Sequence, residues 1–293
     1  MSTVSRDPTI SCIMLPQSRR WIIQTIRLFL NQDYEPKELI VFDNGPHPIG
    51  DLVPRDSHVR YIRIERTLSP GAGRNFACSQ ARGEIIVHWE EGYWYAPDHL
   101  LYLLNGLMRS NADCCVVDPL SVYDLDSGKG WRIHGWLDSA RPAPYGPLAY
   151  TRTFWQDGPF DETDEDEIGR FVRSVPNGQM AVLPEAACQV AVVWPSRIGI
   201  QKKSNARAYP GSKLHALLGR DSRFFGVQPG VPGQRRTRSR RPARGSMGEL
   251  PLSAASAILL ARDPRLSALA IDCFLSQDYE PRELIVIDDT PVS

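Results

Sequence analysis

An internal repeat constrains the fold of this chain more than any other feature of its sequence. Residues 11–46 and residues 256–291 align without a gap. Both contain the block Gln-Asp-Tyr-Glu-Pro, followed by Glu-Leu-Ile-Val and an aspartate, which is Asp43 in the first copy and Asp288 in the second. Self-similarity of this length marks a duplicated supersecondary unit. The fold must therefore contain the same local unit twice.

Each copy has the pattern of a strand, a helix and a second strand. In the first copy, residues 10–15 form an apolar run typical of a strand that is buried on both faces. Apolar residues recur at helical spacing from Trp21 to Leu30, and the helix ends before Pro36. Residues 39–42 form the second apolar strand. A unit of this length joins parallel strands by a right-handed crossover.

The first copy continues into further alternating strands and helices. Strands are expected at residues 59–64, 84–89 and 114–117, and helices at residues 70–81 and 97–110. This alternation predicts an α/β sheet that carries helices on both faces. The second copy lacks such a continuation in this sequence, and one βαβ unit is below the size that usually folds alone. We expect it to dock on the first domain, pair with another chain or stay partly disordered.

Three segments follow from these patterns. Residues 1–203 contain the α/β domain, residues 204–250 a partly helical and then disordered linker, and residues 251–293 the partial repeat. The linker is rich in Arg, Pro and Gly, with six arginines and no acid between Arg235 and Arg244. Such a composition buries too little apolar surface to offset the entropy of ordering, which predicts a solvated tether. The alternative is a basic arm that contacts RNA, anionic lipid or an acidic partner.

The overall composition argues against several other classes of protein. The formal net charge is zero and the isoelectric point is about 7.0, so the whole molecule has no bias toward nucleic acid or membranes. The six cysteines form no CxxC pair and no cluster with histidine at zinc spacing, and we expect them to be reduced and structural. Neither a signal peptide nor a long apolar run is visible, which predicts a cytoplasmic protein.

Several motifs occur in an order and at a spacing that resemble a known family. They are the opening strand–helix–strand unit, the segment Leu-Ser-Pro-Gly-Ala-Gly-Arg-Asn at residues 68–75, and Gly-Glu-Ile-Ile-Val-His-Trp-Glu-Glu at residues 83–91. Further matches lie at residues 148–155 and 159–172. The chain resembles the family 2 glycosyltransferases. This resemblance implies a GT-A type nucleotide-sugar-binding fold, with a mainly parallel sheet and helices on both faces.

The resemblance implies a donor site at the carboxyl edge of the sheet. Asp43, which Asn44 follows, ends the second strand and can accept hydrogen bonds from a uracil-type base or a ribose. Gly71 and Gly73 allow the backbone to approach a diphosphate at a helix N-terminus. Arg74 adds a charge-assisted contact to phosphate. The alternative for the two glycines is an ordinary loop before a helix.

The resemblance also implies a metal site. In the family, an Asp-rich run before an aromatic residue holds a divalent cation, Mn²⁺ or Mg²⁺, which neutralises the leaving diphosphate. If Trp94 is this aromatic residue, Glu90 takes the first carboxylate position, whereas Gly92 and Tyr93 stand where Asp is expected. Glu90 and Glu91 remain as candidate ligands. The competing interpretation is an acidic loop that holds no ion.

The expected catalytic base departs from the family pattern as well. Inverting members place a Glu-Asp pair at the start of a helix, where the Asp deprotonates the acceptor hydroxyl. A match without gaps puts Glu167 on the Glu and Ile168 on the Asp, and isoleucine cannot take a proton. A shift of one or two residues offers Asp166 as the base, with Glu165 before it. The alternative is a solvated acidic loop at a helix N-terminus.

These residues leave two main functions open. The first is a glycosyltransferase that moves a sugar from a nucleotide-diphospho-sugar to a hydroxyl acceptor. The second is a catalytically degenerate member of the family that acts as a nucleotide-binding or scaffold module. Loss of a metal ligand and a base together favours the second, because each loss costs orders of magnitude in rate.

Overall fold

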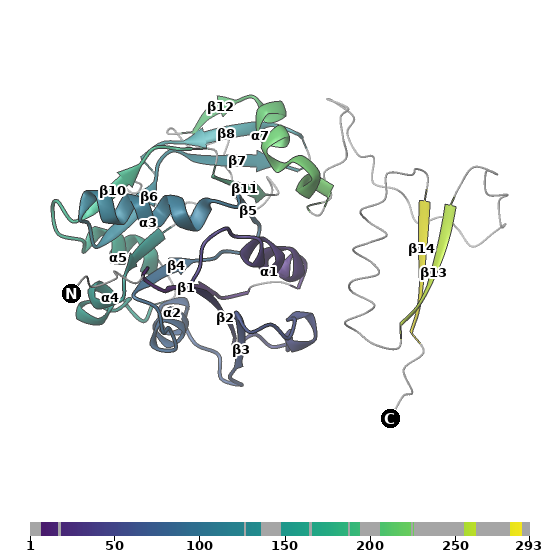
Figure 1. Ribbon diagram of the computed structural model, residues 1–293, viewed down its shortest axis with the longest axis horizontal. Coiled ribbons are helices and arrows are strands. Elements are labelled where there is room, and N and C mark those ends of the chain that lie inside the picture. The colour runs from purple at the N-terminus through teal and green to yellow at the C-terminus, as the bar shows by residue number, and fades with distance from the viewer. Residues whose placement is uncertain are drawn as a thin grey trace, which may run out of the picture. The chain divides into compact units, whose positions relative to one another are not determined.

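We describe the fold from a computed structural model. It describes residues 7–16, 19–125, 127–135, 148–163, 166–186, 188–193, 206–223, 225, 255–261 and 282–288. The chain divides into two compact units, Met1–Pro232 and Gly233–Ser293 (Figure 1). Of the helices in the described residues, none combines the length and the apolar character needed to cross a bilayer.

A seven-stranded sheet forms the centre of the first unit, in the order β10-β6-β9-β4-β1-β2-β3. Its strands are β1 (Ile10–Met14), β2 (Lys37–Asp43), β3 (Val59–Arg63), β4 (Ile85–His88), β6 (Cys114–Val117), β9 (Leu148–Thr151) and β10 (Met180–Leu183). The block β4-β1-β2-β3 is parallel throughout, and β9 runs antiparallel between β4 and β6. Strands β1 and β2 are buried along their whole length, as their apolar sequences predict.

The helices of the first unit are held by packing and by local caps. They are α1 (Ile22–Leu30), α2 (Pro70–Ser79), α3 (His99–Ser110), α4 (Arg152–Asp157), α5 (Glu167–Arg173) and α7 (Gly211–Leu218). Helix α1 has no side-chain cap and buries Ile22, Ile26 and Phe29. Helix α2 begins after Ser69, whose hydroxyl accepts a hydrogen bond from the Ala72 amide.

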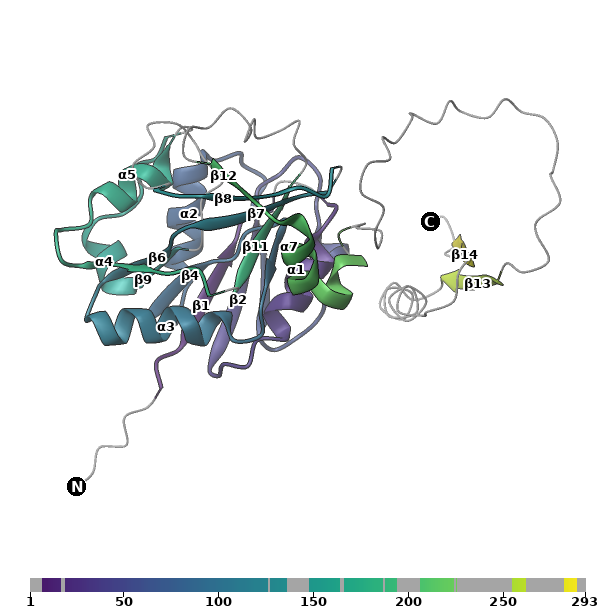
Figure 2. The same cartoon turned by 90° about the horizontal axis from the view of Figure 1, so that it is seen from above.

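The crossovers place helices on both faces of the sheet. The chain moves from β1 to its neighbour β2 through α1, and returns from the edge strand β3 to β4 through α2. Because both connections are right-handed by the usual rule and run in opposite directions, α1 and α2 cover opposite faces (Figure 2). This confirms the α/β class and the mainly parallel sheet.

A second sheet has five strands in the order β12-β8-β7-β11-β5. Its strands are β5 (Tyr93–Tyr95), β7 (Leu120–Asp124), β8 (Gly130–Ile133), β11 (Gln189–Val193) and β12 (Ala206–Tyr209). The first unit also extends past residue 203, the boundary expected from composition. Strand β12 pairs with β8, and the Trp94 indole donates to Asp221 in the 3₁₀ helix η4 (Gly219–Arg223) at 2.9 Å.

The second unit contains the parallel strands β13 (Ala255–Ala261) and β14 (Arg282–Asp288). They correspond to β1 and β2 of the first copy, as the repeat predicts. The helix expected between them and the arginine-rich stretch of the linker lie outside the described residues.

Candidate functional site

Three residues that the sequence assigned to different roles meet in one charged cluster. Arg74 of α2 donates through Nη1 to Glu90 Oε1 at 3.0 Å and through Nε to Glu167 Oε1 at 3.1 Å. Glu90 follows β4, and Glu167 begins α5. The cluster therefore joins three elements at the carboxyl end of β4, where open α/β sheets bind ligands.

Two of the three side chains of this cluster are buried. The side chains of Arg74 and Glu167 are each only 8% exposed, whereas that of Glu90 is 24% exposed. Burial alone would lower the pKa of Arg74, but the two glutamates outweigh it and raise that pKa, so the guanidinium stays charged. Glu90 is thus the most accessible of the three side chains.

A buried chain of polar groups lies beside the guanidinium. His88 Nδ1 lies 3.4 Å from Arg74 Nη1, and His88 Nε2 lies 3.1 Å from the hydroxyl of Tyr150. That hydroxyl contacts Cys78 Sγ at 3.3 Å. Burial, with help from Arg74, holds the pKa of His88 well below its usual range, so the ring is neutral. Since arginine only donates, Nδ1 is the acceptor and Nε2 carries the proton.

Sequence reasoning missed the roles of His88 and Tyr150. The available signal was a histidine inside the otherwise apolar run Ile-Ile-Val-His-Trp of the β4 region. Its neighbour Tyr150 lies 62 positions away in the chain, so only the pairing of β4 with β9 brings the two together.

Asp43 lies at the carboxyl end of β2, as expected, but its carboxylate is already engaged. It accepts from the amides of Gly45 and Ile49 at 3.0 and 3.1 Å and from the Tyr61 hydroxyl at 2.6 Å. Arg63 forms an ion pair with it at 2.9 Å. Burial would raise the pKa of Asp43, but these donors outweigh it and hold the pKa below its usual value. In this arrangement Asp43 orders the loop that follows β2.

The neighbouring Asn44 is turned toward the segment before α2. Its side-chain amide donates to the Leu68 carbonyl at 3.4 Å. The end of β2 and the entry to α2 are therefore linked, as a shared donor site requires. A contact of Asp43 and Asn44 with a nucleoside stays a prediction.

Both glycines of α2 are explained by internal packing. A Cβ atom at Gly71 would collide with the carbonyl oxygen of Asp161, and one at Gly73 would lie 3.1 Å from the side chain of Leu15 and 3.4 Å from that of Phe42. The Gly71 amide also donates to the Thr163 carbonyl at 3.4 Å. Gly71 thus allows the chain's own loop to approach the helix N-terminus, and a diphosphate contact stays a prediction.

The residues after β4 do not fit a divalent cation. Glu90 Oε1 is bound to Arg74, and Gly92 contributes no side chain. Tyr93 is buried in β5. Within the described ranges, no three His, Cys, Asp or Glu side chains are grouped so that they could hold a metal ion. The prediction of Glu90 and Glu91 as metal ligands therefore finds no support in the donor set.

The two candidate catalytic residues separate at the start of α5. Glu167 points to Arg74, whereas Asp166 pairs with Arg173 on its own helix and is 31% exposed. Ile168 is 1% exposed and lies in the core. Of the two adjacent acids, Asp166 is the one that an acceptor could reach. Glu165 lies outside the described residues.

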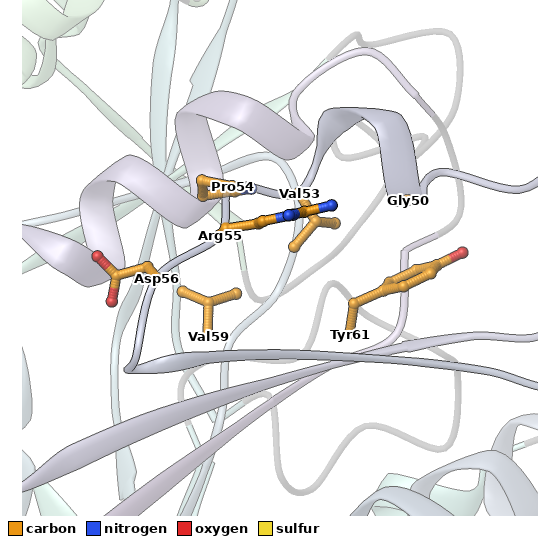
Figure 3. A pocket seen from close by; sticks show the side chains of 7 residues that line it. All are labelled: Gly50, Val53, Pro54, Arg55, Asp56, Val59 and Tyr61. Carbon is orange, nitrogen blue, oxygen red and sulfur yellow. The ribbon is translucent and has the colours of Figure 1, made fainter. Parts of the chain in front are cut away.

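A cavity of about 520 Å³ lies beside the edge strand β3 and the 3₁₀ helix η1 (Gly50–Leu52). It is lined by Gly50, Val53, Pro54, Arg55, Asp56, Val59 and Tyr61 (Figure 3). None of the predicted site residues lines it. The Tyr61 hydroxyl, which donates to Asp43, links this cavity to the end of β2.

Comparison with known proteins identifies the family. The chain resembles solved structures of S. aureus TarS 1-349. For the complex with UDP-GlcNAc, the identity is 15%, the TM-score 0.50, and the alignment covers 72% of this chain and 64% of that chain. For TarS 1-349 by itself, the identity is 16%, the TM-score is 0.49, and the alignment covers 63% of this chain and 60% of that chain. For the complex with UDP, the identity is 16%, the TM-score is 0.49, and the alignment covers 73% of this chain and 72% of that chain. No curated protein matches this chain.

Because the sequence identities are low, the structural likeness shows the fold alone. The chain spans less than two thirds of the length of the first two TarS structures described above. The family profile for glycosyl transferase family 2 matches residues 17–169, just over half of the chain. With the GT-A type fold and the cluster at its carboxyl edge, this match shows that the chain belongs to glycosyl transferase family 2.

Proposed function

We propose that the first unit binds a nucleoside-diphospho-sugar at the carboxyl edge of β1, β2 and β4, and transfers the sugar to a hydroxyl acceptor. The observation that carries the proposal is the convergence of Arg74, Glu90 and Glu167 from three elements on this edge. TarS structures of the same fold were solved with UDP-GlcNAc and with UDP. These ligands make UDP the first nucleotide to test.

Arg74 is the proposed contact for the diphosphate. Its Nε and Nη1 groups are directed to the two glutamates, and its Nη2 group makes no hydrogen bond to any described residue. A guanidinium held by two carboxylates has a fixed orientation, so its remaining N–H groups point in a fixed direction. Asp43 and Asn44, at the end of the neighbouring strand β2, lie at the edge where the nucleoside would bind.

Asp166 is the proposed base, and Glu167 holds Arg74. Asp166 would take the proton of the acceptor hydroxyl, while the acceptor oxygen bonds to the anomeric carbon of the sugar. The bond between that carbon and the diphosphate breaks, and the nucleoside diphosphate leaves with the electron pair. The ion pair with Arg173 positions Asp166 at the start of α5.

A second function is nucleotide binding without transfer. It is favoured by Ile168, which is buried at the position where the family pattern places the base. In that case Asp166 and Arg173 form only a surface ion pair, which contributes little to the stability of the fold.

Isothermal calorimetry with UDP, followed by measurement of UDP release from UDP-GlcNAc and other UDP-sugars, tests both functions. We expect UDP to bind, and Asp166→Asn to lower UDP release by about 100-fold or more while binding is unchanged. Asp161→Asn is the matched control, because it removes another exposed ion pair with α5, to Arg170. Binding without release by the wild-type chain supports the second function. Absence of UDP binding overturns the donor site.

A further inference from the structure

We infer that Arg74, rather than a divalent cation, supplies the positive charge that faces the donor diphosphate, so that this chain binds UDP without metal. This inference rests on the proposed donor site. It concerns how the site neutralises the diphosphate, which is the task that the family resemblance assigned to Mn²⁺ or Mg²⁺.

The first argument is that the candidate metal ligand is already neutralised. Glu90 Oε1 accepts from Arg74 Nη1 at 3.0 Å, and the same guanidinium binds Glu167 at 3.1 Å. A divalent cation at Glu90 would lie next to a buried guanidinium and would be repelled by it. Glu90 thus acts as a positioning residue for Arg74.

The second argument is that the backbone excludes a carboxylate at position 92. Gly92 has a φ of +84°, a conformation that side chains other than glycine rarely adopt. A Cβ atom there would lie 2.9 Å from the ring of Trp21. Replacing Gly92 by Asp would therefore strain the chain rather than restore a ligand. The packing of the loop between β4 and β5 thus favours glycine over a carboxylate-bearing residue at position 92.

The charge balance of the cluster gives a way to test the inference. Arg74 carries one positive charge, Glu90 and Glu167 carry two negative charges, and His88 is neutral. The cluster is therefore negative by one charge, although Arg74 still has its Nη2 group available for an anion. Removing the charge of Glu90 should strengthen binding of a diphosphate, whereas removing a metal ligand should weaken it. The two possible roles of Glu90 thus predict changes of opposite sign in the affinity for a diphosphate.

Calorimetry of the full chain with UDP, in EDTA and in MnCl₂ or MgCl₂, is the first test. We expect Kd values that agree within about two-fold, because the Arg74 guanidinium and not a metal ion contacts the diphosphate. Binding that appears only with Mn²⁺ or Mg²⁺ overturns the inference and leaves the donor site intact. Failure of UDP to bind in every buffer overturns the donor site and, with it, the inference.

The variant Glu90→Gln is the second test, because it keeps the shape and a hydrogen-bond acceptor for Arg74 but removes the charge. We expect the Kd for UDP in EDTA to fall by about five-fold. Weaker binding in Mn²⁺ together with unchanged binding in EDTA would instead identify Glu90 as a metal ligand. Glu84→Gln is the matched control, because Glu84 is exposed and precedes β4 at the end of the strand opposite to the cluster, and it should change the Kd by less than about two-fold. Circular dichroism verifies that each variant is folded.

Discussion

The two copies of the repeat form the same pair of parallel strands in the same register, but in different surroundings. Ile10 stands opposite Lys37 in the first copy, and Ala255 stands opposite Arg282 at the equivalent positions of the second. In the first copy, β4 pairs with the other edge of β1, and β3 with the other edge of β2. In the described part of the second unit, β13 and β14 form a two-stranded sheet.

The polar residues of the first copy show what the surroundings add. Ser11 Oγ donates to Glu38 Oε1 at 2.7 Å, and the same carboxylate accepts from the Arg82 amide at 2.7 Å. The Gly83 amide donates to Ser11 Oγ at 2.8 Å. Ser11 and Glu38 belong to the repeat, whereas Arg82 and Gly83 lie outside it.

Gln32 behaves in the same way. Its side chain accepts from the Leu100 amide at 3.0 Å and donates to the Ala96 carbonyl at 2.7 Å, at the start of α3. The second copy has Ser256, Glu283 and Gln277 at the equivalent positions of its sequence. Local sequence thus specifies the strand pair, whereas the buried polar residues need a larger domain to satisfy them.

Replacing the equivalent phenylalanine of each copy should separate the two copies most strongly. Phe29 is fully buried and packs edge-on against Trp89 at a centroid distance of 5.9 Å. We expect Phe29→Ala to destabilise the first unit by about 3–5 kcal/mol, because it leaves a cavity in the core. The matched variant Phe274→Ala should change that transition by less than about 0.5 kcal/mol. Chemical denaturation followed by tryptophan fluorescence measures both. Equal losses would show that the two units unfold together.

Removal of the shared glutamate should have a smaller effect. Glu38→Ala leaves the Ser11 hydroxyl and the Arg82 amide without their acceptor, which should cost about 2–3 kcal/mol in the first unit. Glu283→Ala is the matched control, and we expect it to leave that transition unchanged within about 0.5 kcal/mol. The same denaturation experiment applies. A loss in Glu283→Ala as large as that in Glu38→Ala would mean that the second copy supports the first unit.

Acid should also distinguish the two units, because protonation of a buried histidine can destabilise only the first. All six histidines lie in the first unit. Burial lowers the pKa of His99 to about 3. The unfolded chain therefore binds a proton at this residue that the folded chain does not bind. His99 therefore does not reduce the free energy of unfolding of the first unit above about pH 6.5. Below that pH it lowers this free energy by about 1.4 kcal/mol for each pH unit, down to about pH 3.

Denaturation of the first unit at pH 7, 6, 5 and 4 measures this slope. In His99→Leu the dependence on pH should be shallower, since the titrating group is gone. A slope that is identical in the variant and the wild-type chain would assign the acid sensitivity to other groups.

Much of the fold could be predicted because its signals are local. The apolar runs and helical spacing predicted β1, β2, β3, β4, β6 and the helices α1, α2 and α3, with ends that differ by a few residues. The five-stranded sheet was missed, because its strands are short and come from distant parts of the chain. Strand β12 begins after residue 203 and is held by its pairing with β8, which no local pattern reports.

The candidate site could likewise be predicted only in part. Arg74, Glu90 and Glu167 could be named from their motifs, but each was assigned a separate role. Their shared hydrogen bonds depend on the packing of α2, the end of β4 and α5, which no local pattern reports.

By itself, the sequence determined the α/β class, the parallel strand pair of each repeat and the family, because apolar periodicity and motif order are local properties. Only the tertiary structure decided the state of the charged groups. A carboxylate that can bind a metal in isolation binds Arg74 here, because burial makes an unpaired charge costly and the nearest opposite charge satisfies it.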